Sequence, residues 1–326
     1  MKNIITIDHG SGGQLTSQLI EDIIVPSFQN DALSELKDGA ILINQEHPLV
    51  FSTDSFVVDP WNFSGGDIGK LAICGTNNDI LMAGGIPKYL SCSLIIEEGF
   101  LLDNLKLILN SMKETAKACD IQIVTGDTKV IEKQKGNQIF INTSGIGFLK
   151  RKTSYSYKEE DVVIVSGSIA RHGASIFMAR EDIQLLGEVH SDCAPLNEQA
   201  KNAMDIEGLR IMRDPTRGGI ATTCIELIEQ TEFGMELYEQ EIPIDLDVKT
   251  LCSLLGFDPL YLACEGRMLA ICAKEDANKM CQALGQDAKI IGKIIKSHPK
   301  ELHLKTKLGA TRRLRKLSGQ PLPRIC

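Results

Sequence analysis

Residues 65–79 read GGDIGKLAICGTNND, and this stretch decides the fold. Asp67 stands directly before an apolar segment, where an aspartate side chain can accept hydrogen bonds from the first amides of a helix. We therefore predict a helix that Asp67 caps and that continues through Leu71 and Ala72. The stretch ends on the polar residues Gly-Thr-Asn-Asn-Asp, which place a second carboxylate, Asp79, at the end of an apolar run.

Segments of strand and helix composition lie on both sides of this predicted helix. Runs rich in Val, Ile and Phe predict strands at 40–44, 49–56, 121–125 and 138–149. Between them, residues 101–119 carry Leu101, Leu105, Ile108, Leu109, Met112 and Ala116 with helical spacing, which predicts an amphipathic helix. These elements make up a first predicted domain, residues 1–150.

A second series of elements follows the polar segment 151–160. It begins with a buried type of strand at 161–165 and includes helical patterns at 174–181 and 219–229. Strands that alternate with helices in two successive halves predict an α/β (α+β) protein with a second domain at 161–304. Residues 305–326 are expected to be a flexible basic tail.

The charge of the chain is unevenly distributed. The 326 residues carry a net charge of −8, which argues against a nucleic-acid surface spanning the whole protein. No acidic residue follows Glu301, whereas seven basic ones do: Lys305, Lys307, Arg312, Arg313, Arg315, Lys316 and Arg324. On charge alone, a basic tail that is merely solvated explains this run as well as a functional basic segment does.

The sequence also bears on compartment and cysteine use. It has no signal peptide and no apolar run near the roughly 20 residues of a membrane helix, so we expect a cytoplasmic protein without a membrane partner. None of the ten cysteines has CxxC spacing, which makes a zinc ribbon improbable. The exception in position is Cys326, the last residue, whose exposed chain end makes it a candidate reactive thiol.

Residues 9–13, HGSGG, form the first segment with chemical character. The backbone amides of a loop containing Gly10, Ser11, Gly12 and Gly13 can approach an anion closely, so these four are candidate nucleotide-binding residues. The segment matches neither a Walker A sequence nor GxGxxG. A loop without a ligand is at least as good an interpretation of these residues alone.

Three aspartates end apolar runs: Asp54, Asp79 and Asp127. Carboxylates that converge in this way can hold Mg²⁺ together with substrate phosphates. Lys129 can supply a positive charge for a phosphate. A single aspartate of this kind is usually a turn residue, and the glycine-rich loop upstream is what favours the metal–nucleotide interpretation. Residues 213–219, RDPTRGG, open a helix in which Asp214 or Thr216 can be the cap, and their two arginines favour an anion.

Together these segments resemble the HypE family of hydrogenase-maturation proteins, in the AIR synthetase (PurM-like) superfamily. The matching pieces are HGSGG (9–13), TDSFVVDP (53–60), GGDIGKLAICGTNND (65–79), TGDTKV (125–130), RDPTRGG (213–219), LGFDPLYLACEG (255–266) and PRIC (323–326). The resemblance implies two α/β domains with ATP between them, and a homodimer whose N-terminal domains pair into a β-barrel. The terminal PRIC is the most specific piece.

The resemblance further implies the chemistry. The partner HypF places a carbamoyl group on Cys326, ATP drives its dehydration to a thiocyanate, and the HypC–HypD complex takes the cyanide for the iron of a [NiFe] hydrogenase. Asp54, Asp79 and Asp127 are then expected to hold Mg²⁺, with Asp67, Lys70 and Asn78 beside the nucleotide. Glu265 is our candidate base and Lys129 the candidate for phosphate charge; for both, a structural ion pair is the alternative.

The sequence departs from the family pattern at two places, and two alternative functions remain open. Cys264 stands where the family pattern has an asparagine, and Gln320-Pro321 changes the approach to the last four residues. One alternative is a superfamily enzyme that acts on a free small molecule. The other is a nucleotide-regulated module whose basic tail binds nucleic acid, although the tail has no aromatic residue to stack on bases.

Overall fold

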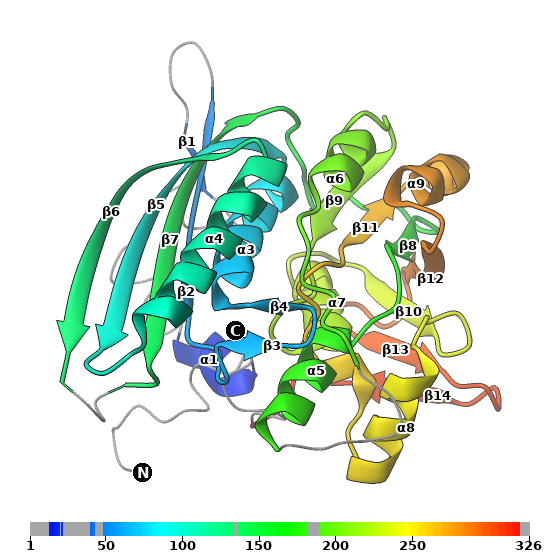
Figure 1. Cartoon of the computed structure of the whole chain (residues 1–326). Coiled ribbons are helices and arrows are strands. Elements are labelled where there is room, and N and C mark those ends of the chain that lie inside the picture. The colour runs from blue at the N-terminus through cyan, green and yellow to red at the C-terminus, as the bar shows by residue number, and fades with distance from the viewer. Residues whose placement is uncertain are drawn as a thin grey trace.

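The computed structural model describes residues 13–19, 21, 40–42, 48–132, 136–181 and 189–319 (Figure 1). The elements of the first half are α1 (Gln14–Leu19), β1 (Ala40–Leu42), β2 (Leu49–Phe56), β3 (Asn62–Phe63), β4 (Gly66–Asp67), α3 (Ile68–Met82), β5 (Gly85–Glu97), α4 (Leu102–Ala118), β6 (Gln122–Ile131) and β7 (Ile139–Leu149). The strands and helices predicted for this half are present, and β2, β7 and α4 lie within one residue of the expected bounds. Strand β6 continues six residues beyond its expected end at 125, and β5 was not predicted.

The first sheet has the order β1-β2-β7-β5-β6, and only its β5–β6 pair is parallel. Helices α3 and α4 cover one face of this sheet and separate it from the second half of the molecule (Figure 1). The predicted cap of α3 is confirmed, because the Asp67 carboxylate accepts hydrogen bonds from the amides of Gly69 and Lys70 at 2.7 and 3.0 Å. This cap fixes where α3 begins.

Helix α4 packs with a narrower face than its apolar spacing predicts. Ile108, Met112 and Ala116 are buried, whereas Leu101 and Leu109 are exposed. On the other face of the sheet, apolar side chains are each about two-fifths exposed: Phe51, Tyr89, Ile95, Ile146 and Phe148. No described helix covers this outer face, as Figure 1 shows.

The second half contains β8 (Val162–Val165), α5 (Arg171–Arg180), α6 (Asn197–Met204), β9 (Leu209–Arg213), α7 (Gly219–Glu229), β10 (Gly234–Tyr238), α8 (Leu246–Leu255), the short 3₁₀ helices η3 (Pro259–Tyr261) and η4 (Lys274–Asp276), β11 (Leu269–Cys272), α9 (Ala277–Leu284), β12 (Lys289–Ile295), β13 (Leu302–Lys305) and β14 (Thr311–Leu314). Its sheet has the order β14-β13-β10-β12-β8-β11-β9. The side chains of β8 alternate between the two faces: Val162 and Ile164 pack with α6 and α9, whereas Val163 and Val165 join the larger core with α7.

The predicted tail begins too early. Residues 311–314 form β14, an edge strand paired antiparallel with β13, and the Leu314 side chain is buried. Arg312 pairs with Asp258 at 3.0 Å and Arg313 with Glu301 at 2.7 Å. The expectation of a flexible tail is therefore wrong for this part of 305–326, because the alternating side chains of β14 pack and pair on the sheet.

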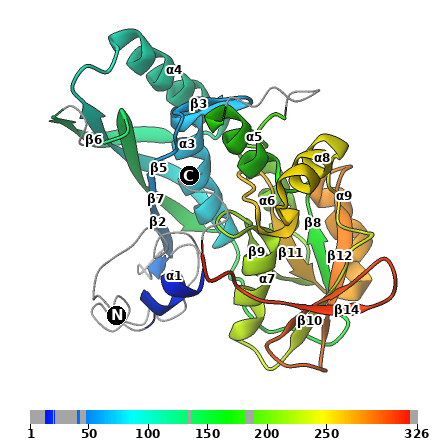
Figure 2. The same ribbon diagram turned by 90° about the horizontal axis from the view of Figure 1, so that it is seen from below.

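The two ends of the described chain meet. The Gln14 amide donates to the Leu317 carbonyl at 2.9 Å, and Lys316 Nζ contacts Ser17 Oγ at 3.2 Å. Figure 2 shows α1 beside the red end of the chain. Across the described ranges, no helix combines the length and apolar character needed to cross a bilayer.

Candidate active site

Helix α3 is bonded to a segment of the second half, residues 191–197. Asn77 Nδ2 donates to Asn197 Oδ1 at 2.9 Å. Asn78 Nδ2 donates to the Ala194 carbonyl at 3.1 Å, and Asn78 Oδ1 accepts from the Leu196 amide at 3.0 Å. Asn78, predicted as a nucleotide contact, therefore uses its side-chain amide to join the two halves.

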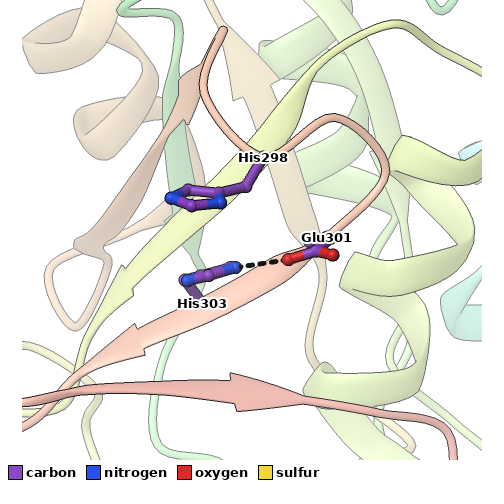
Figure 3. A group of neighbouring side chains, drawn as sticks. All are labelled: His298, Glu301 and His303. Carbon is purple, nitrogen blue, oxygen red and sulfur yellow. Dashed lines mark hydrogen bonds and ion pairs between the residues drawn. The ribbon is translucent and has the colours of Figure 1, made fainter.

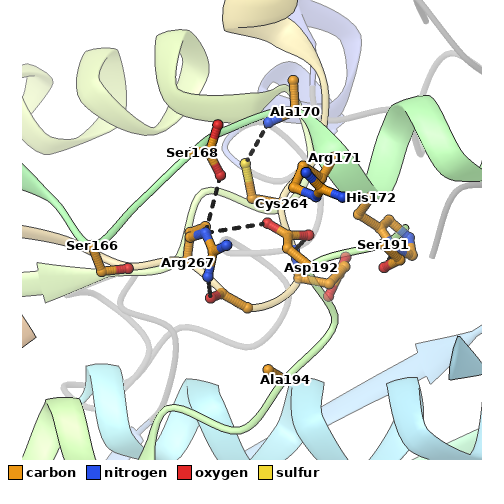
Figure 4. A network of polar contacts seen from close by, with 12 residues as sticks. Ser166, Ser168, Ala170, Arg171, His172, Ser191, Asp192, Ala194, Cys264 and Arg267 are labelled. Carbon is orange, nitrogen blue, oxygen red and sulfur yellow. Dashed lines mark hydrogen bonds and ion pairs between the residues drawn. The ribbon is translucent and has the colours of Figure 1, made fainter. Parts of the chain in front are cut away.

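The same segment holds Glu265 in place, although 73 residues separate Asp192 from it in sequence. The Glu265 amide donates to Asp192 Oδ1 at 3.1 Å, and the Ala194 amide donates to the Glu265 carbonyl at 3.4 Å. Gly266 lies so close to the Asp192 carbonyl that a Cβ atom there would collide with it. Figure 4 shows Asp192 with Arg267, whose Nε lies 3.9 Å from Asp192 Oδ2. Asp192 is thus a positioning residue that the sequence did not reveal.

Glu265 is a buried carboxyl that forms no ion pair with another described residue. Its residue is 4% exposed, and among the described residues its Oε1 has no hydrogen-bond partner. Burial raises its pKa well above the ordinary value, and the neighbouring ionisable groups of Cys193, Asp214 and Asp54 raise it further. The structural ion pair considered for Glu265 is absent from the described contacts, and the carboxyl has a high affinity for a proton.

Two aspartates share this environment. Asp54 is in β2 and its carboxylate faces α3, where Oδ2 lies 3.7 Å from the Cβ position of Gly75. Burial raises the pKa of Asp54, and it raises the pKa of Asp214 to about 6, while the charge of Arg217 lowers both. Asp79 lies on the same side of the sheet, since its Oδ2 accepts from Ser52 Oγ at 2.8 Å. Carboxylate oxygens are the type of ligand that Mg²⁺ prefers.

Asp214 does not have the capping role that its motif allows. Helix α7 begins at Gly219 after Gly218, without a side-chain cap from Asp214 or Thr216. A Cβ on Gly219 would lie 2.6 Å from the Leu260 carbonyl oxygen and 2.7 Å from that of Leu262. The glycine therefore lets α7 approach residues 260–262, which lead to Glu265. The two arginines of the motif lie near carboxylates, Arg213 near Glu226 and Arg217 near Asp54 and Asp214.

Asp127 and Lys129 lie elsewhere. Both are in β6, and their side chains pair at 2.9 Å on an exposed strand. Asp127 is opposite Ser93, whereas the row containing Asp54 passes through Cys92. Because neighbouring residues of a strand point to opposite faces, Asp127 lies on the outer face and Asp54 on the helix face. Within one chain the structure does not bring the three predicted aspartates together.

The remaining predicted residues divide into two groups. Gly10, Ser11, Gly12 and Cys326 lie outside the described residues. Gly13 is buried at the start of α1, Asp67 caps α3, and Lys70 Nζ donates to the Gly65 carbonyl at 2.9 Å.

Cys264, the departure from the family pattern, is fully buried. Its Sγ accepts a hydrogen bond from the Ala170 amide at 3.2 Å (Figure 4). A sulfur atom therefore supplies the backbone contact at this position. This contact holds the residue before Glu265 against the start of α5.

Comparison with known proteins identifies relatives along the whole chain. Residues 36–149 match the family "AIR synthase related protein, N-terminal domain", and residues 158–305 match its C-terminal domain. The chain is 41% identical to carbamoyl dehydratase HypE of Cupriavidus necator, covering 99% of this chain and 95% of the relative. A HypE–HypF complex superposes with a TM-score of 0.87 at 40% identity, covering 92% and 99% of the two chains. HypE in complex with ATP gives 0.83 at 38% identity, covering 99% and 100%.

Proposed function

Because this chain belongs to the HypE carbamoyl dehydratases of the AIR synthase related family, we propose that Cys326 is its substrate-bearing residue. The chain is an ATP-dependent carbamoyl dehydratase of hydrogenase maturation. It converts an S-carbamoyl group on its own terminal cysteine to a thiocyanate, which provides the cyanide ligand of the [NiFe] hydrogenase iron. The full-length match to HypE proteins and the solved structure of HypE in complex with ATP support this activity.

The reaction balances with ATP as co-substrate. The carbamoyl oxygen attacks the γ-phosphorus of ATP and ADP leaves, so the oxygen on the carbon now carries the phosphoryl group. The nitrogen loses both of its protons, the C–O bond breaks, and a C≡N bond forms. One proton is released and the other is carried by the hydrogen phosphate that leaves.

The single observation that carries our assignment of the base is the buried Glu265 carboxyl. A group that takes protons from an amide nitrogen must have a high proton affinity and must be shielded from water. Glu265 has both properties, and it stands between the two halves beside the Asp54 and Asp214 carboxylates. Asp192 would position it through the hydrogen bond to its amide.

Asp54, Asp79 and Asp214 are the carboxylates that we propose for Mg²⁺ within one chain. The bound ion would neutralise charge on the phosphates of ATP. The positive charge of Arg217 lowers the pKa of both Asp54 and Asp214 and so stabilises their ionised forms. Asp127 and Lys129, predicted to bind metal and phosphate, both lie on the outer face of the sheet. We propose these two roles only for a site to which a second copy of the chain contributes the other residues.

The proposed partners follow from the same membership. A solved complex of HypE with HypF supports a carbamoylating partner of the HypF type. We also propose a HypC–HypD complex as the cyanide acceptor, a homodimer formed through the outer face of the first sheet, and action in the cytoplasm. The apolar residues of that face supply the surface such a dimer needs.

A test of the self-substrate assignment is ADP formation by the purified chain in the presence of a HypF-type partner and carbamoyl phosphate. With Cys326→Ser, the ADP that depends on this enzyme's dehydration step should fall to the level seen with the partner alone. The control is Cys281→Ser, at a partly buried position on α9. Undiminished ADP formation by Cys326→Ser would instead favour a free small-molecule substrate.

A further inference from the structure

Two histidines and a glutamate gather at the turn between β12 and β13, far in sequence from the residues assigned above. His298 and Glu301 come from the turn and His303 from β13 (Figure 3). The two imidazole rings stack with centroids 4.4 Å apart, and His303 Nε2 is 2.9 Å from Glu301 Oε2. The dehydration reaction uses none of these three side chains.

We propose that His298, Glu301 and His303 bind one divalent transition ion of the Zn²⁺ class. Each residue offers one ligand atom, and the three atoms lie within 4.8 Å of one another. The centre of a triangle with 4.8 Å sides is about 2.8 Å from each corner, whereas Zn²⁺ lies at about 2.0–2.2 Å from nitrogen and oxygen ligands. The ligands therefore need to close by less than about 1 Å each.

The donor set selects the class of metal. Two imidazoles and one carboxylate suit Zn²⁺ and its neighbours, whereas Mg²⁺ prefers a shell of oxygen ligands. Three protein ligands leave the fourth tetrahedral position for water. The site is therefore expected to be distinct, in both place and metal, from the carboxylates proposed for Mg²⁺ beside ATP.

The carboxylate of the cluster is already held in place by an ion pair. Arg313 Nη1 pairs with Glu301 Oε1 at 2.7 Å, which leaves Oε2 toward the histidines. A partner of this kind orients a ligating carboxylate. The Arg313 charge also opposes a cation, so we expect moderate affinity.

The backbone keeps the three residues in place. The Glu301 amide donates to the His298 carbonyl at 3.1 Å, and the Met235 amide donates to the Glu301 carbonyl at 3.1 Å. The Lys300 amide donates to the Phe233 carbonyl at 2.8 Å. The turn is thus hydrogen-bonded to Phe233 and Met235, the residues on either side of the first residue of β10. Side-chain rotations then suffice to bring the three ligand atoms closer together.

The test is calorimetric titration of ZnCl₂ into the full chain carrying Cys326→Ser, which removes the terminal thiol as a competing ligand. We expect one equivalent to bind, and binding at least about 10-fold weaker when His298→Ala and His303→Ala are added. Adding His190→Ala instead, a histidine outside the cluster, should leave the affinity unchanged. Excess MgCl₂ should not displace the zinc.

Thermal unfolding without metal checks whether the variants are folded. The histidine double variant should melt within a few degrees of its parent in EDTA, and ZnCl₂ should raise the melting temperature of the parent alone. One-equivalent binding that survives the loss of both histidines would overturn the proposal. So would a parent protein that neither binds ZnCl₂ nor is stabilised by it.

Discussion

Glu265 illustrates how one buried side chain combines several requirements of the reaction. Its backbone is fixed from both sides, by Asp192 and by Ala194, while its carboxyl lies among other acids. Burial and these like charges both favour the protonated form. The resulting strong base is available only when its proton has been lost, which links activity to pH.

The first prediction concerns Glu265→Gln. The amide has nearly the same shape but cannot accept a proton, so the dehydration rate should fall about 10²- to 10⁴-fold. The affinity for ATP should change little, because Glu265 is not proposed to contact phosphate. Single-turnover conversion of the carbamoylated protein measures this rate.

The pH profile separates a base from a structural residue. Because the Glu265 pKa is raised, the wild-type rate should still be increasing with pH where an ordinary glutamate would already be ionised. In Glu265→Gln this rise should disappear. A variant that dehydrates at the normal rate, or keeps the same profile, would remove the assignment.

The second prediction concerns Asp214 and stability. Its pKa is about 6 in the folded chain and 3.8 ordinarily, so the folded state holds the proton more tightly. The unfavourable contribution of the charged form therefore grows as pH rises from about 4 to about 6, to roughly 3 kcal/mol at 1.36 kcal/mol per pH unit. Asp214→Asn should raise the melting temperature at pH 7.5, and much less at pH 4, while activity falls.

A control with the opposite sign is Asp276→Asn. The hydrogen bond from Lys279 lowers the pKa of Asp276, so its stabilising contribution is present above the ordinary pKa and is lost on acidification. This variant should lower the melting temperature at pH 7.5. If the melting temperatures of both variants shift in the same direction, the buried charge of Asp214 is not the cause of its effect on stability.

At the scale of elements, β14 connects the second sheet to the chain end that bears Cys326. The strand is an edge strand, held by Arg312 to Asp258 and by Arg313 to Glu301. Ion pairs this exposed contribute little to stability, about 0–1 kcal/mol each. Their effect should therefore lie in where the strand directs the residues that follow it.

The third prediction concerns Arg312→Gln combined with Arg313→Gln. Dehydration should slow several-fold while carbamoylation by the partner stays within about two-fold, because only dehydration needs the chain end to return to the buried carboxylates. Mass spectrometry of the two steps measures both rates. Lys279→Gln, which removes an ion pair on α9, serves as the control. Equal slowing of both steps would contradict this role of β14.

Local elements could be predicted from sequence, whereas contacts between distant residues could not. The Asp67 cap and the strand at 49–56 depend on neighbouring residues, and both are confirmed. The bond between Asp192 and Glu265 depends on the packing of two segments, and nothing local marks Asp192. Asp127 was expected at the end of a run, but β6 continues to Ile131 and its alternation sends Asp127 to the outer face.

At the scale of the whole molecule, the uncovered face of the first sheet carries a group of exposed apolar side chains. Phe51, Ile146 and Tyr89 lie side by side across three neighbouring strands. A contiguous apolar surface of this kind usually marks an interface. We therefore expect it to be where two copies meet.

The fourth prediction is that Ile146→Lys converts the dimer to a monomer. A charge at the centre of the paired surface would be buried without a partner, which opposes association. Light scattering during gel filtration measures the mass, and circular dichroism checks the fold. Leu246→Lys, at an exposed site on α8, should leave the mass unchanged. A wild-type chain that is monomeric at micromolar concentration would contradict the proposed dimer.

The central claim is that the chain acts on its own terminal cysteine. Its most direct test is the intact mass of the C-terminal peptide after incubation with a HypF-type partner, carbamoyl phosphate and ATP. The account predicts a carbamoyl adduct on Cys326 that becomes lighter by one water as ATP is hydrolysed by the dehydratase. An unmodified Cys326 in a reaction that still consumes ATP through this chain would contradict it.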